Sequence, residues 1–223
     1  MSADTSNHRV TVPRDPVNDY TRDAAELRLS FARQHSGASL EHISRYSFDP
    51  EVVAGNVEQF IGAVTADLSR ADPADAAYFT ARRDRYEQVG LADYHAAITR
   101  IRDRFAGTRV GASESIVAYL CPALGLDLVT PPSFLRAVSE GTDVSAGDTA
   151  TINRQIRTRA FAVYLENTQN LTPDVQAQVS AARAAGIPSV AVTETLEPSG
   201  VTFQAWQTAQ LDSLYAALEH SHD

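Results

Sequence analysis

Two acidic side chains stand directly after short apolar runs in this sequence. Glu114 follows the run from Val110 to Ser113, and Glu194 follows the run from Val190 to Thr193. Both runs have the composition of buried strands. If the strands are parallel, both carboxylates emerge at one edge of one sheet, where open α/β sheets bind ligands. Two hard oxygen donors that converge there predict a site for a divalent cation.

A third acid has a comparable position, because Glu166 follows the predicted strand over residues 160–165. Parallel strands would bring Glu166 to the same edge as the other two acids. A second interpretation requires no ligand: acids at strand-to-helix junctions stabilise the N-terminus of the following helix. Spacing alone leaves both interpretations open.

The hydrophobic pattern changes from helical periodicity to β/α alternation after Gly107. Before this point, the start signals Asp49-Pro50 and Asp72-Pro73 predict a helix over 50–69 and one long helix to about 106, interrupted near Gly90. After it we expect strands at 108–112, 127–130, 160–165 and 189–193, with helices at 115–124, 145–159, 172–186 and 203–218. Such alternation predicts an α/β fold with a four-stranded parallel sheet flanked by helices and preceded by a long linking helix.

The same patterns divide the chain into three parts. Residues 1–44 show no sustained apolar periodicity and are expected to be poorly ordered or divergent. Residues 45–106 form the helical segment with the long linking helix, and residues 107–223 form the α/β lobe. The sequence has 223 residues, which is enough for a full hydrophobic core.

Composition excludes several classes of function. The formal net charge of −9 opposes binding to a nucleic-acid backbone, so no nucleic acid partner is expected. No apolar run is long enough for a membrane-spanning helix. The single cysteine, Cys121, precludes an internal disulfide and reads as a small buried hydrophobe.

Catalysis is not predicted. The sequence has no G-x-S-x-G elbow, no H-E-x-x-H helix, no glycine-rich phosphate loop and no C-x-x-C pair. Paired carboxylates would permit glycosidase-type acid and base chemistry, but nothing else in the sequence supports a hydrolase. We therefore expect a binding protein and not an enzyme.

An ordered series of motifs resembles the metal-binding solute receptors of zinc and manganese ABC transporters, the cluster A-I or ZnuA/TroA-like family. The resemblance covers mainly the C-terminal half of that family. The matching pieces are Phe48-Asp49-Pro50, Ala71-Asp72-Pro73, Gly111 to Glu114, Asn167-Thr168-Gln169, Gly186-Ile187-Pro188, and Val192 to Leu196 ahead of Trp206.

The resemblance implies two lobes joined by a rigid helix, with a transition-metal ion held between them. It implies that Glu114 and Glu194 are the metal ligands of the C-terminal lobe, that Zn²⁺ or Mn²⁺ is the transported ligand, and that the partner is an ABC permease. It also implies an extracytoplasmic location, periplasmic or at the cell surface, although this chain shows no signal peptide or lipobox.

The chain departs from the family pattern in its N-terminal part. Arg45 stands where the family places a histidine ligand, and Arg cannot coordinate a cation. The N-terminal lobe is expected to be missing or degenerate. His42 lies near the missing ligand, His8, His35 and His95 are weaker candidates, and the terminal His220 and His222 read as a tail.

Two alternatives follow from this departure. One is a truncated or repurposed relative that binds no metal tightly and acts as a scaffold or protein-interaction module. The other is an incomplete gene product. A half-receptor would expose apolar surface, so weak self-association is also expected.

Overall fold

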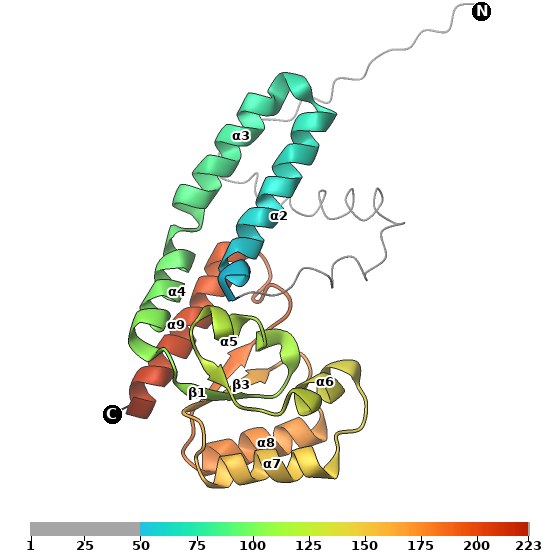
Figure 1. Ribbon diagram of the computed structural model, residues 1–223, viewed down its shortest axis with the longest axis vertical. Helices are drawn as coiled ribbons and strands as arrows, with labels where there is room; N and C mark the ends of the chain where they lie inside the picture. The colour runs from blue at the N-terminus through green and yellow to red at the C-terminus, as the bar shows by residue number, and fades with distance from the viewer. Residues whose placement is uncertain (1–49, 223) are drawn as a thin grey trace, which may run out of the picture. The chain divides into compact units, whose positions relative to one another are not determined.

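The computed structural model describes residues 50–222, in which four parallel strands form one sheet (Figure 1). These residues belong to one unit, spanning 47–223. The predictions for the segment 1–44, for Asp49 and for Arg45, His8, His35 and His42 concern residues that lie outside the described range. Among the described residues, no helix has the length and apolar content needed to cross a bilayer.

The sheet has the strand order β2-β1-β3-β4. Its strands are β1 (Arg109–Ala112), β2 (Asp127–Leu128), β3 (Val163–Asn167) and β4 (Ser189–Val192). All three pairings are parallel, with Gly111 opposite Tyr164 and Glu166 opposite Ala191. The predicted α/β class with a four-stranded parallel sheet is therefore confirmed.

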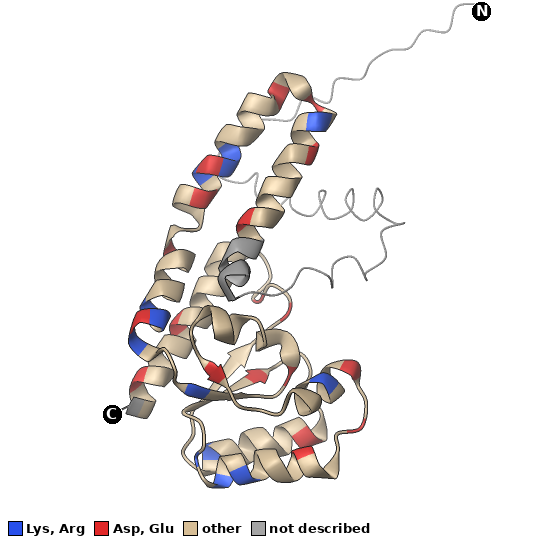
Figure 2. Cartoon of the chain, in the orientation of Figure 1, with Lys and Arg blue, Asp and Glu red and all other residues tan. Residues whose placement is uncertain are grey.

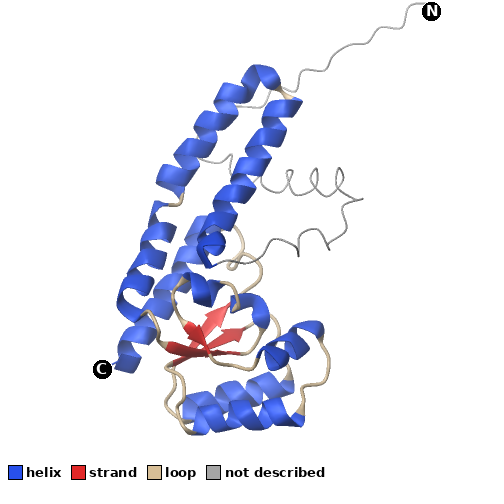
Figure 3. Cartoon of the chain, viewed as in Figure 1, coloured by secondary structure: helices blue, strands red, loops and turns tan. Residues whose placement is uncertain are grey.

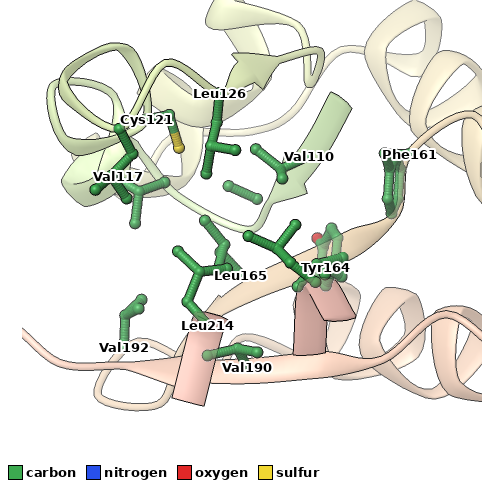
Figure 4. Close-up of a cluster of buried hydrophobic side chains, with 14 of the residues drawn as sticks. Val110, Val117, Cys121, Leu126, Phe161, Tyr164, Leu165, Val190, Val192 and Leu214 are labelled. Atoms are coloured by element: carbon green, nitrogen blue, oxygen red, sulfur yellow. The ribbon is translucent and has the colours of Figure 1, made fainter. Parts of the chain in front are cut away.

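Helices cover both faces of this sheet (Figure 3). The helices of the described residues are α2 (Pro50–Ala71), α3 (Ala76–Arg85), α4 (Ala92–Phe105), α5 (Leu120–Ala123), α6 (Pro132–Glu140), α7 (Ala146–Arg157), α8 (Pro173–Ala184) and α9 (Phe203–His222). Helix α8 packs on β3 and β4 with α7 beside it, and α9 packs on the same two strands with α4 beside it. Tyr164 donates a hydrogen bond to Gln178 of α8, whereas its neighbour Leu165 points toward Leu214 of α9 (Figure 4), so α8 and α9 lie on opposite faces.

The predicted long helix is interrupted where expected. Helix α3 continues into a π-helical turn at Tyr86–Gly90, and α4 begins at Ala92. A Cβ on Gly90 would lie 2.8 Å from the Tyr86 ring, so a larger residue in this turn would displace that ring. The Asp72-Pro73 start signal produces a short 3₁₀ turn at Pro73–Asp75, in which the Asp72 side chain accepts from the Ala74 N–H.

At two of the predicted helix starts, a side chain caps the N-terminus of the helix. Ser145 Oγ accepts a hydrogen bond from the Asp148 N–H at 3.0 Å and begins α7. Thr172 Oγ1 accepts from the Val175 N–H at 3.3 Å and begins α8, with Pro173 at the first helical position. Both helix starts were predicted because Ser and Thr satisfy the first unpaired N–H groups of a helix.

Several predicted boundaries were wrong. The helix expected at 115–124 is split into a 3₁₀ turn at Ser115–Val117 and the short α5, because Pro122 lacks an N–H and fits only in the first turn of a helix. Strand β3 begins at residue 163 and not 160, after a turn in which Arg159 adopts a φ of 49°. Helix α6 was missed, although Pro132 starts it and Gly141 ends it in the left-handed conformation.

The core lies between the sheet and its covering helices (Figure 4). Every residue of β3 is buried, as is every residue of β1 after Arg109. Gly111 allows a close approach, because a Cβ there would stand 2.8 Å from the Phe161 ring, which stacks on Tyr164. Cys121 is fully buried in this core, as predicted.

Charged residues of both signs lie on the outer helices (Figure 2). Arg100 of α4 pairs with Asp212 of α9 at 2.6 Å, and Arg104 pairs with Glu219 at 2.5 Å. All four side chains are substantially exposed, so these pairs orient α4 against α9 and add little stability.

Glu166 does not reach the edge of the sheet, which corrects the prediction that all three acids meet there. It lies inside β3 and is 6% exposed. Because side chains alternate along a strand, Glu166 faces α8, on the same side as Tyr164. There it pairs with Arg183 of α8 at 2.6 Å.

The burial of Cys121 generates a prediction about its thiol. Burial raises the pKa of this thiol to about 12, so at pH 8 only about one molecule in ten thousand carries the reactive thiolate. We expect the folded protein to leave a disulfide reagent such as DTNB unreacted for hours, and to release one equivalent in guanidinium chloride. Prompt stoichiometric labelling of the folded chain would contradict the burial.

The Glu166–Arg183 pair generates a second prediction. Arg183→Met removes the partner of a carboxylate whose side chain is 8% exposed, while Arg183 itself is 60% exposed. We expect urea denaturation to give a free energy of unfolding lower by roughly 1–2 kcal/mol, below the cost for a fully buried pair because solvent screens the guanidinium. Arg157→Met is the control, since Arg157 is exposed on α7 and forms no ion pair with the described residues. Equal losses in both variants would show that the pair contributes nothing specific.

Candidate metal centre

Glu114 emerges just beyond the C-terminal end of β1. The chain stays extended past Ala112, because the Ser113 N–H donates to the Leu165 carbonyl at 2.9 Å and Glu114 has φ −157° and ψ 166°. The Ala112 N–H donates to Thr130 Oγ1, which fixes the end of the strand from the β2 side. Glu114 is only 5% exposed, so its carboxylate is held in one place.

Glu194 emerges beyond the C-terminal end of β4. The preceding residue, Thr193, is fixed to α9 twice: its N–H donates to Gln210 Oε1 at 2.8 Å, and its Oγ1 accepts from Trp206 Nε1 at 2.8 Å. Glu194 itself is exposed. Helix α9, which packs on β3 and β4, therefore also positions the backbone next to Glu194.

A single amide joins the two carboxylates. Asn167 is the last residue of β3 and is fully buried. Its Nδ2 donates to Glu114 Oε2 at 2.5 Å and to Glu194 Oε1 at 2.8 Å. The structure thus brings Glu114 and Glu194 together at the C-terminal edge of the sheet.

Asn167 has a fixed orientation. Its Oδ1 accepts from the Gln169 N–H at 2.9 Å, so the NH₂ group and not the oxygen faces the carboxylates. Its backbone N–H donates to Oγ of Ser113, which is fully buried. Asn167 belongs to one of the motifs that carry the family resemblance, but no role was predicted for it; its position at the end of a strand was the signal that could have indicated one.

Gln169 connects the loops that follow β3 and β4. Its Oε1 accepts from the backbone N–H groups of Glu194, at 2.9 Å, and Thr195, at 3.1 Å. Its Nε2 donates to Thr195 Oγ1 at 2.7 Å. The backbone around Glu194 is therefore tied to the same loop that carries Asn167.

The electrostatics of this cluster favour a cation. In residues 50–222, neither Glu114 nor Glu194 takes part in an ion pair, and only the neutral Asn167 amide offsets their negative charge. No described group donates a hydrogen bond to Glu114 Oε1 or Glu194 Oε2. Each carboxylate thus keeps one oxygen that can coordinate a metal ion.

The described residues supply only part of a coordination shell. Within residues 50–222 there is no cluster of three or more His, Cys, Asp or Glu side chains that could hold a metal ion. His95 lies 2.7 Å from Glu58, and His220 contacts the Ala216 carbonyl within α9, so neither joins the two carboxylates. Since metal sites usually provide at least three protein ligands, two carboxylates leave positions for water or for further donors.

A hollow of about 340 Å³ lies beside the cluster, with Thr168, Thr193 and Trp206 among its walls. Its lining includes neither Glu114 nor Glu194. The two carboxylates therefore lie outside this hollow.

Solved structures with the same fold are periplasmic metal-binding proteins. The metal-free form of a single-residue mutant from Candidatus Liberibacter asiaticus matches with a TM-score of 0.57 and 17% identity over 74% of this chain and 60% of that chain. The Mn-bound form gives 0.58 and 16% over the same shares. The solute-binding protein FpvC from Pseudomonas aeruginosa, in complex with Mn²⁺, gives 0.52 and 17% over 71% of this chain and 57% of that chain.

At these identities the structural likeness establishes the fold alone, and the match spans about 60% of the length of the first two chains. A comparison with curated protein sequences finds no match. The family described as the periplasmic zinc-uptake complex component A matches residues 18–217, which confirms the resemblance indicated by the motifs. This chain belongs to the ZnuA family of zinc-uptake components.

Proposed function

We propose that this chain is a solute-binding component of a zinc/manganese ABC uptake system and that it binds a divalent transition-metal ion through Glu114 and Glu194. The observation that carries the proposal is the pair of carboxylates held together by Asn167 at the C-terminal edge of the sheet. No described cationic side chain neutralises them.

A bound cation would relieve the repulsion between these two anions. Both carboxylates accept from the same Nδ2 atom, so their negative charges lie close together, and the burial of Glu114 limits screening by water on one side. A neutral amide offsets this repulsion only in part. A divalent ion that contacts one oxygen of each carboxylate would offset it fully.

Family membership supports a divalent transition-metal ion as the bound ligand. The family is described as a zinc-uptake component, and solved structures with this fold include complexes with Mn²⁺, Ni²⁺ and Cd²⁺. Oxygen ligands favour harder ions, so the two carboxylates shift the preference from Zn²⁺ toward Mn²⁺. We extend the proposal to capture of the ion outside the cytoplasmic membrane and delivery to an ABC permease, which the description of the family as a periplasmic zinc-uptake component supports.

The role we propose is binding without catalysis, since the ion leaves the protein unchanged. The family is a class of periplasmic receptors and not a class of enzymes. Carboxylate ligands suit release as well as capture, because a site with few anionic ligands and open positions binds less tightly than a closed four-ligand site.

One observation favours a second candidate function. The described residues provide two ligands, and Arg45 replaces a histidine that the family pattern expects. A relative that keeps the fold but binds no metal tightly would serve as a scaffold or a protein-interaction module. Metal titration separates the two proposals.

Isothermal titration calorimetry of chelator-treated protein with Mn²⁺ and Zn²⁺ tests the proposal. We expect saturable binding by the unmutated chain and at least tenfold weaker binding by Glu114→Gln and by Glu194→Gln, because glutamine keeps the shape but removes the anionic ligand.

Glu140→Gln is the matched control, since Glu140 is an exposed acid at the end of α6. It should bind like the unmutated chain. A flat titration for the unmutated chain would favour the scaffold, and an equal loss in all three variants would place the metal elsewhere.

A further inference from the structure

We propose that Asn167 is a selectivity-determining residue, which makes the site prefer small transition-metal ions over Ca²⁺ by favouring coordination through one oxygen of each carboxylate. This inference rests on the proposed function. Asn167 would not touch the metal; it is a positioning residue that acts through Glu114 and Glu194.

The geometry assigns one oxygen of each carboxylate to the amide. Nδ2 carries two hydrogens, and each is donated to a different carboxylate, to Glu114 Oε2 at 2.5 Å and to Glu194 Oε1 at 2.8 Å. Both hydrogens are therefore used. The oxygens that accept no hydrogen bond from a described group are Glu114 Oε1 and Glu194 Oε2, and these are the stronger ligands for a cation.

The amide cannot easily move out of the way. Asn167 is fully buried, its Oδ1 accepts from the Gln169 N–H, and its backbone N–H donates to Ser113 Oγ. Rotation of the side chain would break its bonds to Glu114, Glu194 and the Gln169 N–H together and leave the buried Asn167 amide and Glu114 carboxylate without these partners, which is unfavourable. We therefore expect the amide to remain in place when an ion binds.

This arrangement discriminates between cations by coordination number. Ca²⁺ takes six to eight oxygen ligands and commonly uses carboxylates in bidentate mode. An amide that donates to one oxygen of each carboxylate uses a lone pair of that oxygen and weakens it as a ligand, so bidentate contact becomes less favourable at both carboxylates. A smaller transition-metal ion needs fewer ligands and accepts one oxygen from each carboxylate, so it loses less.

Removal of the amide would free the second oxygen of each carboxylate. The site could then offer four oxygens without a competing hydrogen bond instead of two, which benefits Ca²⁺ more than Mn²⁺. A role limited to general support of the fold predicts a different result, because a loosened site weakens both ions alike. The ratio of the two affinities separates these explanations.

The test is calorimetric titration of Mn²⁺ and of Ca²⁺ into four full-length chains: unmutated, Asn167→Ala, Asn167→Ser and Asn170→Ala. We expect the preference for Mn²⁺ over Ca²⁺ to fall at least tenfold in Asn167→Ala. Asn167→Ser should lie between, because a hydroxyl donates one hydrogen bond and the amide donates two. Asn167→Ser also tests the inference if Asn167→Ala folds poorly.

Asn170→Ala is the matched control. Asn170 lies in the same loop, and its Nδ2 donates to the Val138 carbonyl and not to either carboxylate. The ratio of the Mn²⁺ affinity to the Ca²⁺ affinity in Asn170→Ala should equal that of the unmutated chain. The fluorescence of Trp206, the single tryptophan of the chain, reports whether each metal-free variant keeps the loop in place, because its Nε1 donates to Thr193 beside Glu194.

The outcomes distinguish a failure of the proposed selectivity role of Asn167 from a failure of the proposed metal binding. If the unmutated chain binds Mn²⁺ but the ratio in Asn167→Ala stays within twofold, the inference is wrong and the proposed function stands. If Asn167→Ala strengthens both ions equally, the amide is a competitor of the metal, and the inference is also wrong. If the unmutated chain binds neither ion, the proposed function fails and the inference fails with it.

Discussion

Two hydrogen bonds from one amide hold the candidate site together. Asn167 donates to both Glu114 and Glu194, and without these bonds two carboxylates would face each other with no described partner. Strand order makes this contact possible, because β3 lies between β1 and β4 in the sheet. A side chain at the end of β3 therefore stands between side chains that follow its two neighbours, and a parallel sheet places all three at the same edge.

The pleat of β3 separates two acidic functions that look alike in the sequence. Glu166 and Asn167 are adjacent, yet successive side chains of a strand point in opposite directions. Glu166 consequently faces α8, where Arg183 neutralises it, while Asn167 faces the two acids at the edge. One position along the strand thus distinguishes a structural ion pair from a cluster with uncompensated negative charge. The second arrangement is the one that suits a cation.

Local signals in the sequence predicted much of this molecule, and long-range geometry limited the rest. Apolar runs located the four strands, and Ser145 and Thr172 located two helix starts, because these signals act within a few residues. The convergence of Glu114 and Glu194 followed from parallel pairing. The role of Asn167 could not be predicted, because the strand order β1-β3-β4 depends on pairing between distant segments and no local sequence pattern indicates it. Glu166 was misplaced because the predicted strand ended at residue 165 and β3 ends at Asn167. Glu166 therefore lies inside the strand, and its side chain points toward one face of the sheet and not toward the edge.

Crystals of the metal-free protein soaked in Mn²⁺ and measured at the manganese absorption edge would test the central claim most directly. We predict one anomalous peak at bonding distance from Glu114 Oε1 and Glu194 Oε2, about 2.0–2.3 Å, with Asn167 Nδ2 still hydrogen-bonded to Glu114 Oε2 and Glu194 Oε1. A peak at the C-terminal histidines, or none near the end of β3 at saturating Mn²⁺, would contradict it.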